Sequence, residues 1–125
     1  FTPNEMRRMI YAHKVRMEQV PVFGAFDCPD AGQSMPRRGR STTAIQALNL
    51  FNSPFVNDRA DKFATRIATA GATSPEAQVD SAFEISLGRK PSETEKTAAE
   101  AVVREHGLAT LCRVLLNSSE FLFIP

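Results

Sequence analysis

The chain has 125 residues, the size of one domain around one hydrophobic core, and its formal net charge is +1. This balance, with 23% charged residues, is typical of an ordinary protein surface and argues against a nucleic-acid-binding protein, which needs a broad basic face. No run approaches the roughly 18 to 20 apolar residues of a membrane-spanning helix, so we expect a single domain over residues 1–125, without a membrane span and without a nucleic-acid partner.

The N-terminal segment, residues 1–43, is the basic part of the sequence. It carries seven Lys and Arg residues against four Asp and Glu residues, whereas residues 44–125 carry eight against ten. Residues 6–17 match the spacing of a helix and the alternation of a strand equally well, so periodicity leaves both open. Residues 21–36 contain three Pro and two Gly, which is typical of a long irregular loop. We expect this third of the chain to be irregular and, if the strand alternative holds, partly extended.

Residues 44–51, with the sequence AIQALNLF, are the next predicted element and form a helix. Apolar residues surround almost its whole circumference, so we expect this helix to be buried on most sides. Amide side chains recur every three residues along it, at Gln46, Asn49 and Asn52. A buried amide needs a hydrogen-bond partner, so these three residues are predicted to form internal hydrogen bonds or to border a cleft.

Four more helices are predicted downstream, because start and stop signals bracket each apolar pattern. They run from Ser53-Pro54 to Gly71, from Ser74-Pro75 to Gly88, from Ser92 to Gly107, and from Leu108 to between Asn117 and Phe121. The signals are N-cap serines, first-turn prolines, an S-x-x-E capping box and terminal glycines. The last helix has a wide apolar stripe and should pack centrally. Residues 44–125 are therefore predicted to be mainly α, a compact bundle of about five helices.

The strongest candidate site combines acidic residues of the irregular loop with basic and hydroxyl residues ahead of the helix over residues 44–51. Its members are Asp27, Asp30, Arg37, Arg38, Arg40, Ser41 and Thr42. Guanidinium groups and the N–H groups of a helix start both bind phosphate, sulfate or carboxylate, so one interpretation is an anion or polar-substrate site. The other is that the arginines pair with the two aspartates and fix the loop onto the helix. The residue types leave both interpretations open.

Motifs for other chemistry are absent or weak. There is no catalytic-triad signature, no phosphate-binding Gly-rich loop and no C-x-x-C-H haem-attachment site, so we assign no catalytic residue, metal or cofactor to this segment. Asp27, Asp30 and His13 lack a diagnostic metal-ligand spacing. The two cysteines, Cys28 and Cys112, either pair or remain separate, with Cys112 a small buried residue of its apolar helix.

Six motifs together resemble a known family: RRMIY, FDCPD, PRRGRSTT, QALNLFNSPF, LGRKPS and LLNSSEF. They are similar to the C-terminal domain of unknown function (domain of unknown function 1553, planctomycete-type) of exported cytochrome c-like multidomain proteins. The resemblance implies an exported bacterial protein, periplasmic or at the cell surface, of which this chain is the C-terminal fragment. It places haem in an upstream domain. Ala44 stands where family members often have Pro, which removes a favoured first helical residue and leaves the cap unchanged.

From these patterns we expect a non-catalytic helical accessory or interaction domain, whose Asp/Arg loop contacts upstream domains of the same chain. The alternative is that the segment completes an enzyme active site, related to carbohydrate or sulfated polysaccharide, in which the arginines recognise an anionic group. No pattern in the sequence indicates an oligomeric state.

Overall fold

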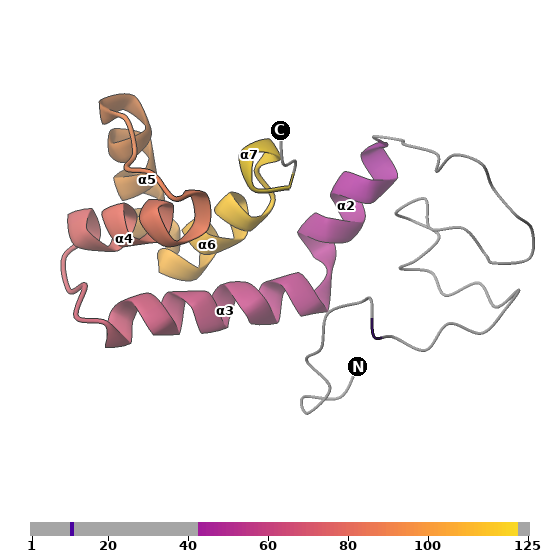
Figure 1. The fold of residues 1–125 in the computed structure, drawn as a ribbon, viewed down its shortest axis with the longest axis horizontal. Coiled ribbons are helices and arrows are strands. Elements are labelled where there is room, and N and C mark those ends of the chain that lie inside the picture. The colour runs from indigo at the N-terminus through magenta and orange to yellow at the C-terminus, as the bar shows by residue number, and fades with distance from the viewer. Residues whose placement is uncertain (1–10, 12–42, 123–125) are drawn as a thin grey trace, which may run out of the picture. The chain divides into compact units, whose positions relative to one another are not determined.

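The computed structural model describes Tyr11 and residues 43–122, and within this part of the chain it contains helices and no strand (Figure 1). The helices are α2 (Ala44–Asn52), α3 (Pro54–Thr69), α4 (Pro75–Leu87), α5 (Glu93–His106), α6 (Leu108–Leu116) and α7 (Ser119–Leu122). The chain divides into two compact units, residues 1–46 and 47–125. The predicted helical bundle is confirmed in the second unit, and apart from Tyr11 and Thr43 the predicted irregular third lies outside the described residues. None of the described helices is long and apolar enough to cross a membrane.

The predicted start signals stand at the beginnings of the helices. Ser74 Oγ accepts a hydrogen bond from the backbone N–H of Ala77 at 3.2 Å, which satisfies a donor that the first turn leaves without an intrahelical partner. Ser92 and Glu95 form the complete capping box at the start of α5. Ser53 has the extended backbone of an N-cap before α3, although its side chain makes no capping hydrogen bond. The predicted helix starts are therefore confirmed.

Two glycines set the direction of the chain between helices. Gly88 ends α4 with a φ of 69°, and its N–H donates to the carbonyl of Glu84 at 3.1 Å. Gly107, with a φ of 85°, separates α5 from α6. Positive φ strains residues with a side chain and costs glycine little, which explains why the predicted glycine stops hold at these positions.

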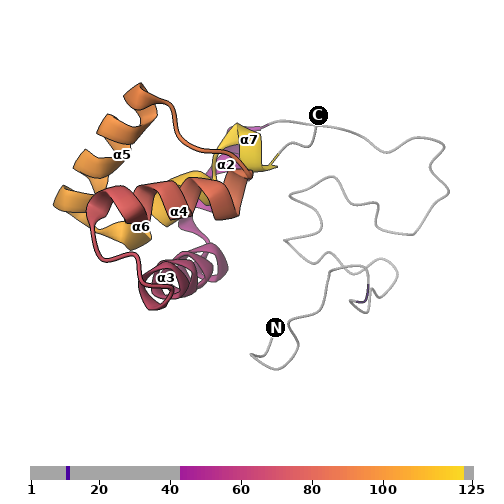
Figure 2. The same ribbon diagram turned by 60° about the vertical axis from the view of Figure 1, so that its left-hand side comes forward.

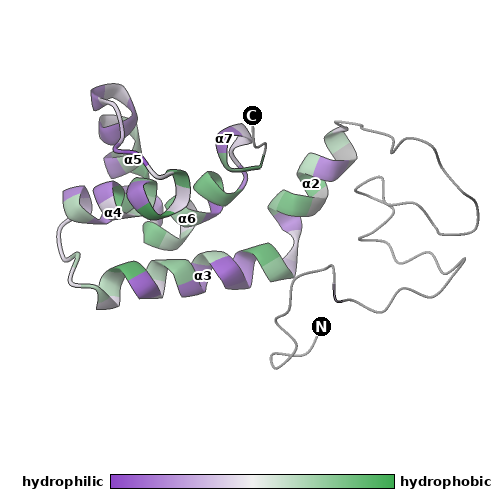
Figure 3. Cartoon of the chain, in the orientation of Figure 1, coloured by the Kyte–Doolittle hydropathy of each residue, from purple (hydrophilic) through white to green (hydrophobic). Residues whose placement is uncertain are grey.

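Helix α6 is the centre of the bundle. It packs against α3, α4, α5 and α7, and Figures 1 and 2 show it beside α4 from two directions. Leu111, Cys112 and Leu115 are each at most 4% exposed, and Figure 3 shows α6 as predominantly hydrophobic. A helix enclosed on several sides needs a wide apolar face, so the prediction of a central last helix is confirmed.

The remaining core residues come from the three helices that surround α6. They are Ala60 and Ile67 of α3, Val79, Ala82 and Phe83 of α4, and Ala99 of α5, with Ala72 from the connection between α3 and α4. No polar or charged residue of the described part is buried. Apolar packing therefore holds the bundle together without buried hydrogen-bonded side chains.

The last predicted helix ends as expected near Asn117, and a further short helix, α7, which the sequence did not predict, follows it. Asn117 Nδ2 donates to the carbonyl of Arg113 at 2.8 Å, and Ser118 Oγ donates to the carbonyl of Leu115 at 2.8 Å. Ser118 Oγ also accepts from the N–H of Phe121 at 3.3 Å. Asn and Ser side chains compete in this way for the backbone groups of a helix, so α6 stops and α7 starts within two residues.

Helix α2 forms where it is predicted, but its exposure differs from the expected burial. Leu48 and Phe51 are 59% and 44% exposed. Asn52 is exposed, Gln46 is partly exposed, and the side chain of Asn49 lies outside what the structure describes. Among the described residues, Leu48 and Phe51 thus remain accessible to water, so the apolar circumference of α2 is left largely open.

Truncation of an isoleucine tests this packing. Ile67→Ala should lower the free energy of unfolding by about 2–5 kcal/mol, because Ile67 is 0% exposed and its removal leaves a cavity in the core. Ile85 is 43% exposed within α4, so Ile85→Ala is a matched control that should cost less than about 1 kcal/mol. Urea unfolding followed by circular dichroism measures both, and equal losses would contradict the described core.

Candidate functional site

The site predicted from the sequence lies outside the described residues. Its members are Asp27, Asp30, Arg37, Arg38, Arg40, Ser41 and Thr42. Their interpretation as an anion site or as loop-fixing ion pairs therefore stays a prediction. The structure does describe the helix start that follows them, from Thr43 onward.

Thr43 and Gln46 close the start of α2 with a reciprocal pair of hydrogen bonds. Thr43 Oγ1 accepts from the N–H of Gln46 at 3.2 Å, and Gln46 Oε1 accepts from the N–H of Thr43 at 3.1 Å. This is a capping box of the T-x-x-Q type, a signal that the interpretation of Gln46 as a buried amide overlooked. Because two backbone donors are satisfied within the chain, fewer N–H groups remain at this helix start for an anion.

The other end of α2 is held by Arg113 of α6. Arg113 Nε donates to the carbonyl of Phe51 at 3.0 Å, Nη2 donates to the same oxygen, and the guanidinium carbon lies 4.0 Å from the centre of the Phe51 ring. The carbonyls of a last helical turn carry partial negative charge and lack intrahelical partners. One side chain therefore caps α2 and stacks on its aromatic residue.

The most highly connected polar group of the described part is Arg89, just after the Gly88 cap. Its Nε and Nη2 donate to Glu120 Oε1 and Oε2 at 2.7 and 2.8 Å. Its Nη1 and Nη2 donate to Glu95 Oε2 and Oε1 at 2.9 and 2.8 Å. Nη1 also donates to the carbonyl of Lys90 at 3.2 Å. All five N–H groups of the guanidinium thus have acceptors. Four of them bind the two carboxylates in bidentate pairs, and the fifth binds a backbone carbonyl.

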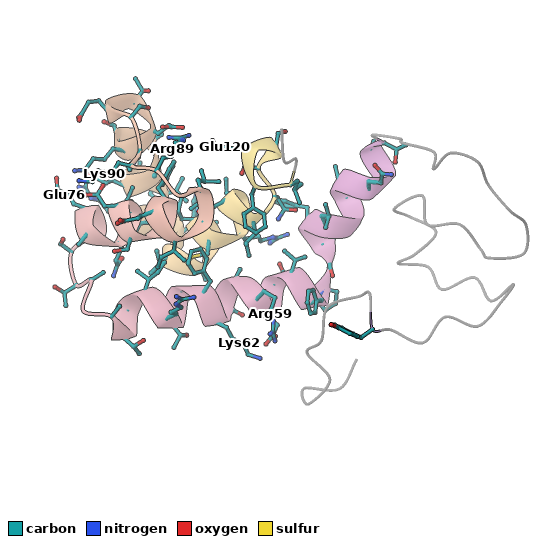
Figure 4. All side chains as sticks on the ribbon, viewed as in Figure 1. Arg59, Lys62, Glu76, Arg89, Lys90 and Glu120 are labelled. Carbon is teal, nitrogen blue, oxygen red and sulfur yellow. The ribbon has the colours of Figure 1, made fainter. Side chains whose placement is uncertain are left out.

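The two glutamates connect Arg89 to different helices. Glu95 belongs to the capping box of α5, where one of its oxygens also accepts from the N–H and the Oγ of Ser92, each at 2.8 Å. Glu120 belongs to α7, 31 residues further along the chain from Arg89. Figure 4 shows Arg89 and Glu120 next to each other. The capping motif predicts part of the arrangement around Glu95, whereas no local pattern predicts the contact with Glu120.

These contacts shift the pKa values of all three side chains. The hydrogen bonds from Arg89, followed by those from Ser92, lower the pKa of Glu95 to about 2. The hydrogen bonds from Arg89 also lower the pKa of Glu120. Hydrogen bonds from Arg89 to Glu120 and then to Glu95 raise the pKa of Arg89. Both carboxylates are therefore ionised around neutral pH, although the side chains are 37% to 47% exposed and partly screened by water.

The depressed pKa of Glu95 predicts a pH dependence of stability. Its contribution is fully present above the unfolded-state value of 4.5 and is lost as the pH falls toward about 2. Arg89→Gln should therefore lower the melting temperature by a few degrees at neutral pH, and the gap to the unmodified protein should shrink below pH 4.5. Lys90→Gln, which removes a neighbouring exposed cation, is the control. A gap that is unchanged down to pH 3 in differential scanning calorimetry would contradict the network.

Cys112 is a core residue of α6 and not a reactive group. It is a free thiol, 0% exposed, and burial raises its pKa to about 12. Since the thiolate is the nucleophile and the metal ligand, this thiol is unreactive near neutral pH. Among the residues that the structure describes, no three His, Cys, Asp or Glu side chains are grouped to hold a metal ion.

Thiol labelling tests the burial of Cys112. In a Cys28→Ser background, iodoacetamide should modify Cys112 at least about a hundredfold more slowly than the unfolded chain, because modification requires opening of the core. Mass spectrometry of samples with and without urea gives the two rates. Labelling of the native protein at the unfolded rate would show that α6 is not enclosed.

Comparison with known proteins identifies a family. A family model described as PSD1, protein of unknown function (DUF1553), matches residues 2–103. The matched segment contains the predicted Asp/Arg loop and Arg89 with Glu95, whereas α6 and Glu120 follow it. No curated protein and no solved structure matches the chain.

Proposed function

We propose that this chain, which belongs to the PSD1 family of proteins of unknown function (DUF1553), is a helical accessory domain that docks onto other domains of a larger protein. The larger protein is exported and carries a cytochrome c-like domain, as the resemblance of the sequence motifs implies. In this proposal the chain supplies a binding surface and no catalytic residue.

The observation that carries the proposal is a set of exposed apolar side chains where α2 meets α3. Leu48, Phe51 and Phe55 are 59%, 44% and 54% exposed. Leu48 and Phe51 lie one turn apart on α2, and Phe55 follows in the first turn of α3. We call these three residues the corner surface. Large apolar side chains that remain open to water at neighbouring positions are typical of an interaction site.

Two arginines give the corner surface the composition of a protein interface. The guanidinium of Arg113 lies over Phe51, and that of Arg59 lies 5.4 Å from the centre of the Phe55 ring. Figure 4 shows Arg59 on the side of α3 that faces away from α6. Aromatic residues and arginine dominate the binding energy of protein interfaces and tolerate burial next to each other.

The predicted Asp/Arg loop supports the same function from the sequence side. It immediately precedes α2 in the chain, and both belong to the residues that match the family. In the proposal the loop and the corner surface bind the same neighbouring domain. Guanidinium groups in the loop supply charge recognition, and the corner surface supplies apolar contact.

Binding in trans tests the proposal. The segment encoded directly upstream of residue 1 is produced separately, and its affinity for the 125-residue chain is measured by calorimetry. Leu48→Ala combined with Phe55→Ala should weaken binding by about tenfold or more, as expected for interface anchors. Both side chains are more than half exposed, so their removal should leave folding intact. The Arg37→Ala, Arg38→Ala double variant should weaken binding as well.

Ile85→Ala is the control, because it removes another exposed apolar side chain, 43% accessible, from α4. An unchanged affinity of the Leu48→Ala, Phe55→Ala variant would contradict docking through the corner surface. If the loop variants instead abolish turnover of a glycan by the complete protein and leave binding unchanged, the alternative of a completed active site is favoured.

A further inference from the structure

We infer that the edge of Arg89 formed by Nε and Nη2 is a carboxylate-binding site, that Glu120 fills it as an internal occupant, and that an external carboxylate displaces Glu120 and releases α7. This inference does not rest on the corner surface or on the predicted Asp/Arg loop. It concerns a different part of the chain, the LGRKPS connection between α4 and α5.

The first support for the site is that the guanidinium stays oriented when Glu120 is removed. Glu95 binds the other edge with two hydrogen bonds of 2.8 and 2.9 Å and is itself fixed by Ser92. The carbonyl of Lys90 takes another donor, and the core residue Phe83 lies 5.6 Å from the guanidinium carbon. Three neighbours other than Glu120 therefore hold the guanidinium, and they leave two parallel N–H groups directed at Glu120.

The second support is that Glu120 comes from a short helix without a buried residue. Helix α7 has four residues, none of which is buried. Its apolar residues Phe121 and Leu122 are 42% and 38% exposed. A helix this short has little stability of its own, so its position depends on its contacts with α4 and α6 and on the pair of hydrogen bonds from Arg89.

The geometry defines the class of ligand. Two parallel N–H groups of a guanidinium match the two oxygens of a carboxylate, and such bidentate pairs are stronger and more specific than single hydrogen bonds. The Arg89 side chain is 39% exposed even with Glu120 in place, so a ligand has access to the site. The carboxylate is either that of a small acid or that of an acidic side chain of a partner, and the experiment separates the two.

The test uses the complete chain with Glu120→Ala, which empties the site. Sodium acetate is titrated against sodium chloride at equal ionic strength, and the Nε–H signal of Arg89 is followed by NMR. Acetate should shift this signal saturably and bind at least about tenfold more tightly than to the unmodified protein, where Glu120 competes as a tethered ligand. Glu120→Gln, which keeps the size of the side chain, serves as a second variant should Glu120→Ala not fold.

The controls define the outcomes. In an Arg89→Lys, Glu120→Ala variant the backbone amide signals of residues 90 and 92–95, recorded in the Glu120→Ala chain as well, replace the missing Nε–H signal. Their saturable shift with acetate should disappear, because lysine cannot present two parallel donors. A peptide with the sequence SSEFL and its SSQFL counterpart, both acetylated at the N-terminus and amidated at the C-terminus so that the glutamate carries the only carboxylate, separate the sources of the carboxylate. Tighter binding of SSEFL than of acetate identifies a partner's acidic side chain, and equal binding identifies a small acid. An absent acetate effect in both Glu120 variants, or an effect that persists without Arg89, overturns the inference.

Discussion

One guanidinium group joins the ends of three helices. Arg89 lies two residues after the end of α4, binds Glu95 in the first turn of α5 and binds Glu120 in α7. A left-handed glycine directly before it and a capping box directly after it fix the backbone on both sides. Three features in chain order therefore define the connection between α4 and α5: the Gly88 cap, Arg89, and the capping box of Ser92 and Glu95. Of these three features, the arginine is the one that binds Glu120.

The polar contacts and the apolar core have separate tasks in this domain. The core contains no buried polar residue in its described part, so the hydrophobic effect supplies its stability without specifying how the helix ends meet. The arginines do specify this. Arg89 directs α5 and α7, and Arg113 holds the last turn of α2 against α6. Both act at half-exposed positions, where the polar contacts of a guanidinium cost little desolvation and can open without unfolding the core.

Local signals made most of the fold predictable from the sequence. Serine caps, first-turn prolines and terminal glycines act within three or four residues, and each of the helices from α3 to α6 begins where they indicate. The helix end near Asn117 was predicted, but the short helix α7 after it was not, because hydrophobic periodicity ignores side chains that bind the backbone. The exposure of α2 was not predicted. An apolar circumference shows that a helix gains from burial, but it does not show which part of the protein buries it. The contact between Arg89 and Glu120 spans 31 residues, and no local pattern reaches that far.

The position of α6 also bears on where the domain ends. The family match stops at residue 103, before the end of α5, whereas Leu111, Cys112 and Leu115 beyond it are among the most buried residues. A chain cut at residue 103 would expose Ile67, Val79 and Phe83 to water, since the helix that packs against α3 and α4 would be missing. Burial of those surfaces drives folding, so the folding unit must extend at least to the end of α6. Helix α7 is not required by the same reasoning, because it adds no buried residue. The matched sequence therefore defines the family and the core defines the folding unit. Helix α7 is a peripheral addition, which packs on α4 and α6 and is bound to Arg89 through Glu120.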